Sequence, residues 1–240
     1  MRILGVVIFL SCCGSMLQAQ PAPSTQPWWQ GGGGGFRRPT TNPDATKLPL
    51  ISVKGNHFVD PQGNVVLFRG LSISDPDKID GQGHWNKEHF EHIKEMGATI
   101  VRIPVHPAAW RGRGPENYMK LLDQAVQWCT DLGIYVDIDW HSIGNLKMEL
   151  FQNPMYETSQ KETYDFWRTI ARHFAGNNTV AFYELFNEPT TFRGTLGNIT
   201  WHDWKEINEN MIKLIRATDK EKIELVAGFD WAYDLTPLRE

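Results

Sequence analysis

The sequence lacks three features that would place the chain in a specialised class of protein. Beyond its first twenty residues, no segment approaches the roughly 20 apolar residues that a transmembrane helix needs. Lys and Arg are scattered and the formal net charge is -4, so no basic stripe is available for a nucleic-acid backbone. His84, His89 and His92 lie close together, but no carboxylates or cysteines join them at metal-ligand spacing. We therefore expect no transmembrane segment, no nucleic-acid partner, and no metal or other cofactor.

Cysteine is also scarce, with 3 residues in a chain of 240. Two of them lie in residues 1–19, where a basic start, an apolar stretch and small residues up to Ala19 are typical of a secretory signal peptide. Cleavage after Ala19 would leave Cys129 alone, which excludes an intrachain disulfide, and its helical neighbours predict a buried thiol. We predict a secreted or periplasmic protein. Leu10-Ser11-Cys12 resembles a weak lipoprotein processing site, so a lipid anchor through Cys12 is the alternative.

Two further regions are predicted after the signal peptide. Residues 20–47 are rich in Pro, Gly, Ser, Thr and Gln and cannot bury enough apolar surface to order themselves, so they are expected to form a flexible leader. Residues 48–240 carry the apolar periodic segments. With 41% hydrophobic and 12% aromatic residues, the chain is long enough for one sizeable core. A single folded domain over 48–240 is the prediction.

Strand and helix patterns alternate along this domain. A small hairpin around residues 51–59 is expected to lead into a first strand at 65–68. Further strands are predicted at 99–105, 134–139, 180–186 and 223–227, and helices at 87–96, 116–132, 159–174 and 201–217. Such repeated βα units form a parallel sheet, either a doubly wound open sheet or an eight-stranded barrel. No Gly-x-Gly-x-x-Gly follows the first strand, and polar side chains end several strands. Both observations favour a (β/α)8 TIM barrel, of which about five βα units are present.

The tetrapeptide Phe186-Asn187-Glu188-Pro189 places a carboxyl group at the mouth of a strand. Side-chain alternation predicts that Glu184, Phe186 and Glu188 share one side of the strand, while Asn187 leans to the other. Desolvation at an apolar rim raises the pKa of a carboxyl group, and a protonated acid is what a departing sugar oxygen requires. Glu188 is therefore a candidate general acid. A solvated or salt-bridged loop Glu is the alternative interpretation.

Two other strands carry polar groups of interest. Arg102 lies in an otherwise apolar strand, and because a buried guanidinium must be paired, Glu184 is a candidate partner. The pair would serve either structure or catalysis. His141, at the mouth of the next strand, could donate to a sugar hydroxyl, although a lone His is usually structural. Four tryptophans near presumed strand mouths could form sugar platforms or could pack in the core: Trp85, Trp110, Trp140 and Trp231.

Taken in order and spacing, four motifs resemble strands two to five of glycoside hydrolase family 5, which contains secreted cellulases and related β-glycanases. The motifs are Val101-Arg102-Ile103-Pro104, Asp139-Trp140-His141-Ser142, Glu184-Leu185-Phe186-Asn187-Glu188-Pro189 and Gly228-Phe229-Asp230-Trp231. The resemblance implies a retaining mechanism with Glu188 as acid/base. It also implies that Asn187 binds near the sugar 2-hydroxyl, that His141 contacts the reacting sugar, and that Arg102 steadies the nucleophile. Trp140 and Trp231 are further candidates for binding substrate.

The resemblance implies a glycoside hydrolase that cleaves a β-linked polysaccharide, and an endo-β-1,4-glucanase is the leading expectation. A β-mannanase, another β-glycanase and a noncatalytic carbohydrate-binding remnant are the alternatives. In this family the nucleophilic Glu stands on the seventh strand, whereas this sequence ends at Glu240, just after the predicted fifth. The expectation is that the chain has no nucleophile of its own and is inactive alone. Because five strands cannot close a barrel, self-association through open sheet edges is also expected.

Overall fold

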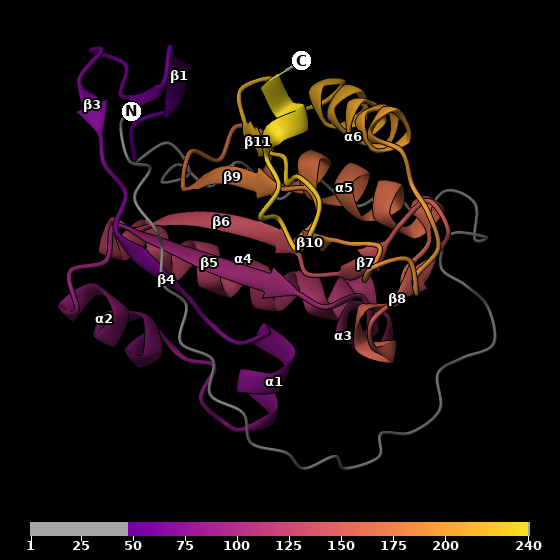
Figure 1. Cartoon of the computed structure of the whole chain (residues 1–240). Coiled ribbons are helices and arrows are strands. Elements are labelled where there is room, and N and C mark those ends of the chain that lie inside the picture. Colours follow the sequence, from indigo (N-terminus) through magenta and orange to yellow (C-terminus); the bar gives the residue numbers. More distant parts are fainter. Residues whose placement is uncertain (1–47, 240) are drawn as a thin grey trace. The chain divides into compact units, whose positions relative to one another are not determined.

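The computed structural model of the chain describes residues 48–239 (Figure 1). The predicted signal peptide at 1–19, the leader at 20–47 and the lipid-anchor site at Cys12 lie outside the described residues. Over residues 48–239, no helix is both long and apolar enough to cross a membrane.

A five-stranded parallel sheet forms the centre of the fold. The strands are β4 (Gly70–Ser72), β5 (Ile100–Val105), β6 (Tyr135–Trp140), β9 (Val180–Glu184) and β11 (Ile223–Leu225). Their spatial order, β11-β9-β6-β5-β4, follows the chain, as expected when each strand is followed by a helix that returns to the next strand (Figure 1). The predicted alternation of strands and helices is confirmed.

A strand forms within the predicted range 65–68, but it is not the first strand of the parallel sheet. Val65–Val66 forms β3, which pairs with an antiparallel hairpin of β1 (Ser52–Lys54) and β2 (His57–Val59), and the first parallel strand is β4. The apolar residues at 65–68 fit a strand pattern because Val66 and Phe68 pack into a core below the sheet. Gly70, by contrast, looks like a turn residue but lies so close to β5 that a Cβ atom would come 1.9 Å from the Ile100 carbonyl oxygen.

Six helices accompany the parallel sheet in the described part of the chain. They are α1 (Pro76–Gly81), α2 (Lys87–Glu95), α3 (Pro107–Arg113), α4 (Pro115–Leu132), α5 (Gln160–Phe174) and α6 (Trp201–Arg216). Local signals set their ends: Thr200 and Asp203 form a capping box at the start of α6, and Gly133 ends α4 in the left-handed conformation. The apolar stripe of α4 is buried, and Cys129 on it is a free, fully buried thiol, as predicted. The short helices α1 and α3 were not predicted.

The core has two parts, one on each face of the sheet. The larger part lies between the sheet and its helices. The smaller part lies on the other face, near the amino ends of the strands, where the β1–β3 sheet covers it. There Phe58 of β2 meets Phe182 of β9 edge to face, with ring centroids 5.0 Å apart. Tyr135 donates from its hydroxyl to the Pro49 carbonyl oxygen, which ties the entering chain to the floor of the sheet. We call this smaller core the floor cluster.

Additional short elements lie beyond the carboxyl ends of the parallel strands. A second sheet has the order β10-β7-β8 and contains β7 (Ile143–Asn145), β8 (Leu150–Phe151) and β10 (Glu188–Pro189). Two 3-10 helices, η2 (Pro154–Tyr156) and η3 (Thr236–Arg239), complete the described chain. In the register of β10 and β7, Glu188 lies opposite Ile143, so this small sheet fixes the backbone of Glu188 beside the loop that follows β6.

Candidate active site

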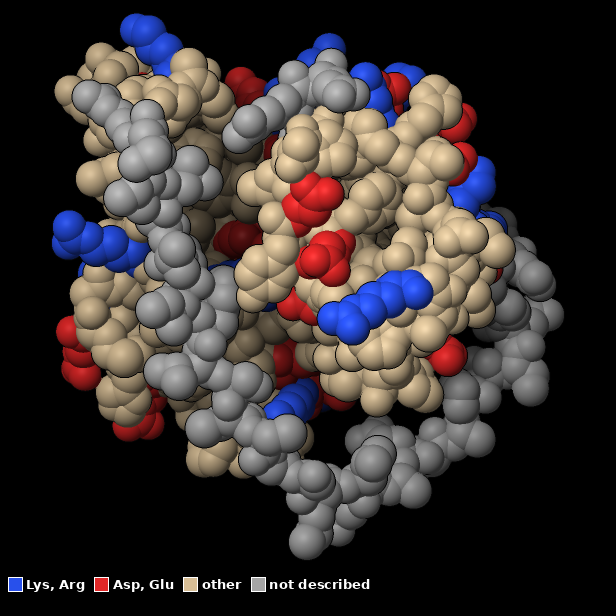
Figure 2. Space-filling model, in the orientation of Figure 1, with Lys and Arg blue, Asp and Glu red and all other residues tan. Residues whose placement is uncertain are grey.

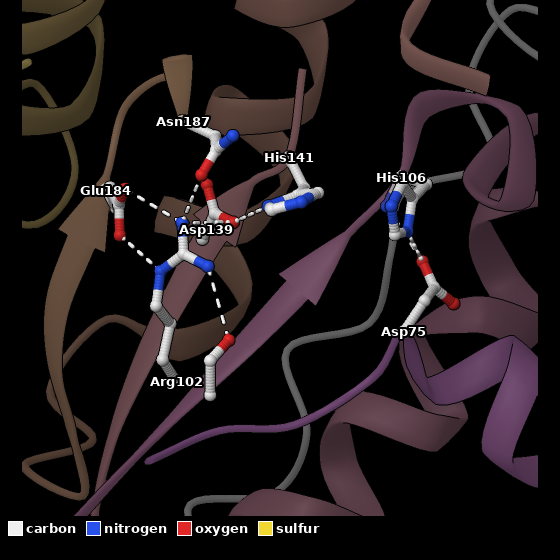
Figure 3. Close-up of polar contacts among 8 residues, drawn as sticks. Asp75, Arg102, His106, Asp139, His141, Glu184 and Asn187 are labelled. Atoms are coloured by element: carbon white, nitrogen blue, oxygen red, sulfur yellow. Dashed lines mark hydrogen bonds and ion pairs between the residues drawn. The ribbon is translucent and has the colours of Figure 1, made fainter. Parts of the chain in front are cut away.

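Arg102 is the centre of a polar network above the floor cluster (Figure 3). From β5 it donates through Nε to Glu184 Oε2 at 2.6 Å and through Nη2 to Glu184 Oε1 at 2.9 Å. Nη2 also meets Asp139 Oδ2 at 2.8 Å. Burial works to lower the pKa of Arg102, but the charges of Asp139 and Glu184 outweigh it and raise this pKa above its usual range. The predicted pairing of Arg102 with Glu184 is confirmed, and its two parallel bonds hold the guanidinium in one orientation.

Asn187 points into this network, against the prediction that it leans away from Glu184. Its Oδ1 accepts a 2.7 Å hydrogen bond from Arg102 Nη2. Phe186 instead faces the helix layer, where its ring meets Trp204 of α6. Strict alternation fails here because β9 ends at Glu184 and the chain bends before β10, so the faces of residues 185–187 no longer follow the pleat.

His141 is held by a buried carboxylate on its own strand. Its Nδ1 lies 2.5 Å from Asp139 Oδ2, and Asp139 is fully buried. The backbone N–H of His141 donates to the Val105 carbonyl oxygen, which continues the β5–β6 ladder past the end of β6. Asp139 thus links His141 to Arg102 and leaves the other ring nitrogen, Nε2, for a ligand. No role was predicted for Asp139, although an Asp two residues before a His at the end of a buried strand signals such a pair.

A third carboxyl group, that of Asp137, completes the network. Asp137 lies opposite Arg102 in the β5–β6 register and is buried. Burial, followed by the neighbouring charge of Glu184, raises the pKa of Asp137 well above its usual value, while Arg102 opposes the shift. The pKa of Glu184 is raised as well, by burial first and then by the charge of Asp139, so three neighbouring carboxyl groups share the charge of one guanidinium.

Glu188 lies half-buried at the rim beside this network. Its backbone N–H donates to the Ser142 carbonyl oxygen at 3.1 Å. Burial raises the pKa of Glu188, and the nearby His141 and Arg102 partly offset this shift. Tyr156 of η2 is close enough that, after burial, the charge of Glu188 raises its pKa as well. Acidic side chains are visible in a recess near the middle of the face shown in Figure 2.

The tryptophans do not all lie where the sequence predicted. Trp140 is fully buried, stacks on Phe166 of α5 and donates to Thr163, so its prediction as a substrate-binding residue is wrong. Trp85 and Trp110 are buried as well. Trp85, in the loop before α2, packs against Phe90, and Trp110 of α3 packs against Tyr118 and Phe166. Trp231 is partly exposed, and its Nε1 donates to Gln152 at 3.4 Å.

The family of the chain follows from comparison with known proteins. A family profile described as Cellulase (glycosyl hydrolase family 5) matches residues 59–239. The chain belongs to this family. The parallel sheet and its helices are accordingly part of a TIM barrel, with the network at the end of the barrel where family members of this fold carry their sites.

Individual relatives give the same class. The β-glucanase SdGluc5_26A of Saccharophagus degradans is 49% identical, with a TM-score of 0.79 over 80% of this chain and 58% of that chain. Endoglucanase A of Butyrivibrio fibrisolvens is 29% identical over 197 residues, which are 77% of this chain and 40% of the relative. The catalytic domain of the Thermobifida fusca endoglucanase Cel5A, 22% identical with a TM-score of 0.62 over 79% of this chain and 57% of that chain, shares the fold. The chain thus spans less than two thirds of these relatives, and it is similar to glycoside hydrolases that act on glucans.

Proposed function

We propose that these residues belong to an exported endo-β-1,4-glucanase that cleaves with retention of configuration. The observation that carries the proposal is Glu188, a half-buried carboxyl group with a raised pKa, held at the rim beside Arg102 and His141. A carboxyl group with a raised pKa keeps its proton to higher pH and can donate it to the oxygen of a glycosidic bond as the bond breaks. The names of the relatives favour a glucan over a mannan, and the S. degradans β-glucanase has been solved with cellotetraose.

Each neighbour of Glu188 has a role in this proposal. Asn187, fixed by Arg102, presents its amide to the sugar near the 2-hydroxyl. His141, oriented by Asp139, donates or accepts at another hydroxyl of the reacting sugar. Trp231 offers a partly exposed indole face to the substrate. Arg102 steadies the side of the site where a nucleophile acts.

Retention requires a second carboxylate about 5–5.5 Å from the acid. The acidic side chains near Glu188 in residues 48–239 do not fill this position. Glu184 and Asp139 form ion pairs with Arg102, and Asp137 is buried. We therefore propose that a polypeptide of these 240 residues, expressed alone, has little hydrolase activity. Release of reducing sugar from carboxymethyl cellulose by this polypeptide, at a rate comparable to that of the S. degradans relative, would contradict this proposal.

The role of Glu188 is tested by Glu188→Gln in the full-length enzyme. Turnover of β-1,4-glucan is expected to fall by about 10²–10⁴-fold, because an amide cannot donate the proton that the leaving oxygen needs. An aryl cellobioside with a good leaving group should lose far less in its first step. Glu157→Gln is the matched control, because Glu157 is an exposed residue just beyond η2, and its rate should stay unchanged. A normal rate on glucan for Glu188→Gln would remove Glu188 from this role.

The same residue predicts a pH dependence. The general acid works only while it is protonated, so kcat/KM should fall as pH rises through the pKa of Glu188. Because burial raises this pKa, the fall is expected at a higher pH than for an exposed Glu, whose pKa is about 4.3. Glu188→Gln should lose this alkaline limb on the aryl substrate. An unchanged alkaline limb in the variant would assign it to another group.

Export is tested at the amino terminus of the mature protein. Mass spectrometry of protein from the culture medium or periplasm should find a chain that begins at Gln20. A lipid-modified Cys12 as the first residue would instead establish the anchored alternative.

A further inference from the structure

We propose that His106, oriented by Asp75, binds a hydroxyl group of the substrate on the glycone side of the cleaved bond. The inference rests on the proposed function and adds a substrate-binding residue to it. His106 directly follows β5, and Asp75 precedes α1, 31 positions earlier. No role was predicted for either residue from the sequence.

Asp75 holds the His106 ring in one orientation. The Asp75 carboxylate is 4% exposed. It caps α1 by accepting from the Asp77 N–H at 2.8 Å, and it accepts from the His106 backbone N–H at 2.8 Å. His106 Nδ1 lies 2.9 Å from the same carboxylate. Because the Asp75 carboxylate also accepts from two backbone N–H groups, we assign Nδ1–H as the donor in this contact, which leaves Nε2 for a ligand.

His106 and His141 form a matched pair at the mouths of adjacent strands. Val105 and Trp140, the residues before them, are partners in the β5–β6 register. The two imidazole rings lie nearly perpendicular, with centroids 4.7 Å apart (Figure 3). Each ring uses Nδ1 to contact a buried Asp, and within residues 48–239 no hydrogen bond engages either Nε2. Both imidazoles are thus held through Nδ1 and leave Nε2 for a ligand.

The order of strands decides which part of the substrate His106 meets. Going along the sheet from β9 to β6 to β5, the side chains at the mouths are Glu188, His141 and His106. In the proposed function the acid stands at the leaving oxygen and His141 contacts the reacting sugar. The next position in this direction lies on the glycone side. The His106 side chain remains 14% exposed, and the Tyr156 ring, 5.7 Å from its centroid, borders the same space. At this partly exposed position, His106 Nε2 can form a hydrogen bond with a sugar hydroxyl group.

Two substitutions separate substrate binding from a structural role. His106→Asn keeps an amide N–H at the position of Nδ1, hence the bond to Asp75, but removes the group at Nε2. His106→Gln keeps a polar group near the position of Nε2. In the full-length enzyme, kcat/KM for an aryl cellobioside should fall about tenfold in His106→Asn and less in His106→Gln, with both thermal midpoints near that of the wild type. His173→Asn is the control, because His173 pairs with Asp123 between α5 and α4, outside the network.

Deoxygenated substrates complete the test. The substrates are aryl cellobiosides that each lack one hydroxyl of the glycone. For one of them, kcat/KM relative to the parent substrate is expected to fall about tenfold in the wild type but no more than twofold in His106→Asn. Equal losses in both enzymes for every such substrate would overturn the proposal, as would a normal kcat/KM in His106→Asn. Calorimetric binding of cellotetraose in a Glu188→Gln background repeats the comparison without turnover. If the wild type does not hydrolyse β-1,4-glucan, only the proposed function is contradicted. If Glu188→Gln binds cellotetraose with the same affinity whether or not it also carries His106→Asn, this inference is contradicted.

Discussion

At the scale of single residues, the Arg102 network shows how one cation organises several acids. Arg102 donates to Glu184 through Nε and Nη2, and its Nη2 also contacts Asp139 and Asn187. Bidentate geometry fixes angle as well as distance, which a Lys at this position could not do. The network orients three of its members, Asn187, Asp139 and, through Asp139, His141. The precision of the proposed site therefore depends on a residue that need not touch the reacting bond.

Asp137 gives a prediction about pH. Its pKa is raised in the folded protein, so the folded state keeps a proton that the unfolded state has lost above about pH 3.9. Between that pH and the folded pKa, Asp137 lowers stability as pH rises, by up to about 1.4 kcal/mol per pH unit. Asp137→Asn removes this dependence. Its stability relative to the wild type should therefore increase with pH, measured by urea unfolding at about pH 5 and about pH 7.

Asp131→Asn provides the comparison, since Asp131 is a surface residue of α4 that pairs with Lys87. Its effect should stay below about 0.5 kcal/mol and show no trend with pH. A constant difference between Asp137→Asn and the wild type at the two pH values would mean that Asp137 is ionised in the folded protein.

At the scale of elements, the β1–β3 sheet has a packing role. It covers the floor cluster at the amino ends of the parallel strands, while the network occupies the space toward their carboxyl ends. Stability and chemistry are thus placed at opposite ends of the same strands, as is general in this fold.

Phe58→Ala tests this separation. Phe58 contacts the rings of Phe68 and Phe182, so its truncation should cost about 2 kcal/mol in the free energy of unfolding, with kcat/KM unchanged at temperatures where the enzyme is folded. Val53→Ala in β1 is the control, because Val53 is 56% exposed and should cost less than about 0.5 kcal/mol. Denaturant unfolding and steady-state kinetics give the two readouts. A loss of kcat/KM in Phe58→Ala without a loss of stability would show that the floor cluster reaches the site.

At the scale of the whole molecule, the two outer strands of the parallel sheet matter most. Within residues 48–239, β4 and β11 each pair with one neighbouring strand of that sheet. A barrel removes such edges by closing, and an unpaired edge is a template for another chain. A polypeptide of these 240 residues alone is expected to form dimers or larger species. Light scattering after size exclusion should show a mass that grows with concentration. A monomer of the short polypeptide at all concentrations would contradict this expectation.

Much of the fold was predictable from the sequence because helices and strands leave periodic local patterns. The bounds of α4, α5 and α6 were predicted to within a residue or two, since Ser159, Thr200 and Gly133 mark their ends. The pairing of Arg102 with Glu184 was predictable because a buried guanidinium demands a carboxylate. The family motifs were predictable because each motif is contiguous in the chain.

The tertiary structure alone decided which way the side chains face and which distant residues meet. Asn187 faces Arg102 and Trp140 faces α5 because β9 ends early and β6 presents alternate residues to the helix layer, which a local pattern does not report. His106 and Asp75 meet across 31 positions through a turn and a helix cap. The sequence by itself thus determined the elements and the family, because these depend on neighbours in the chain. The geometry of the site depended on register and chain bends, which are set by contacts between strands.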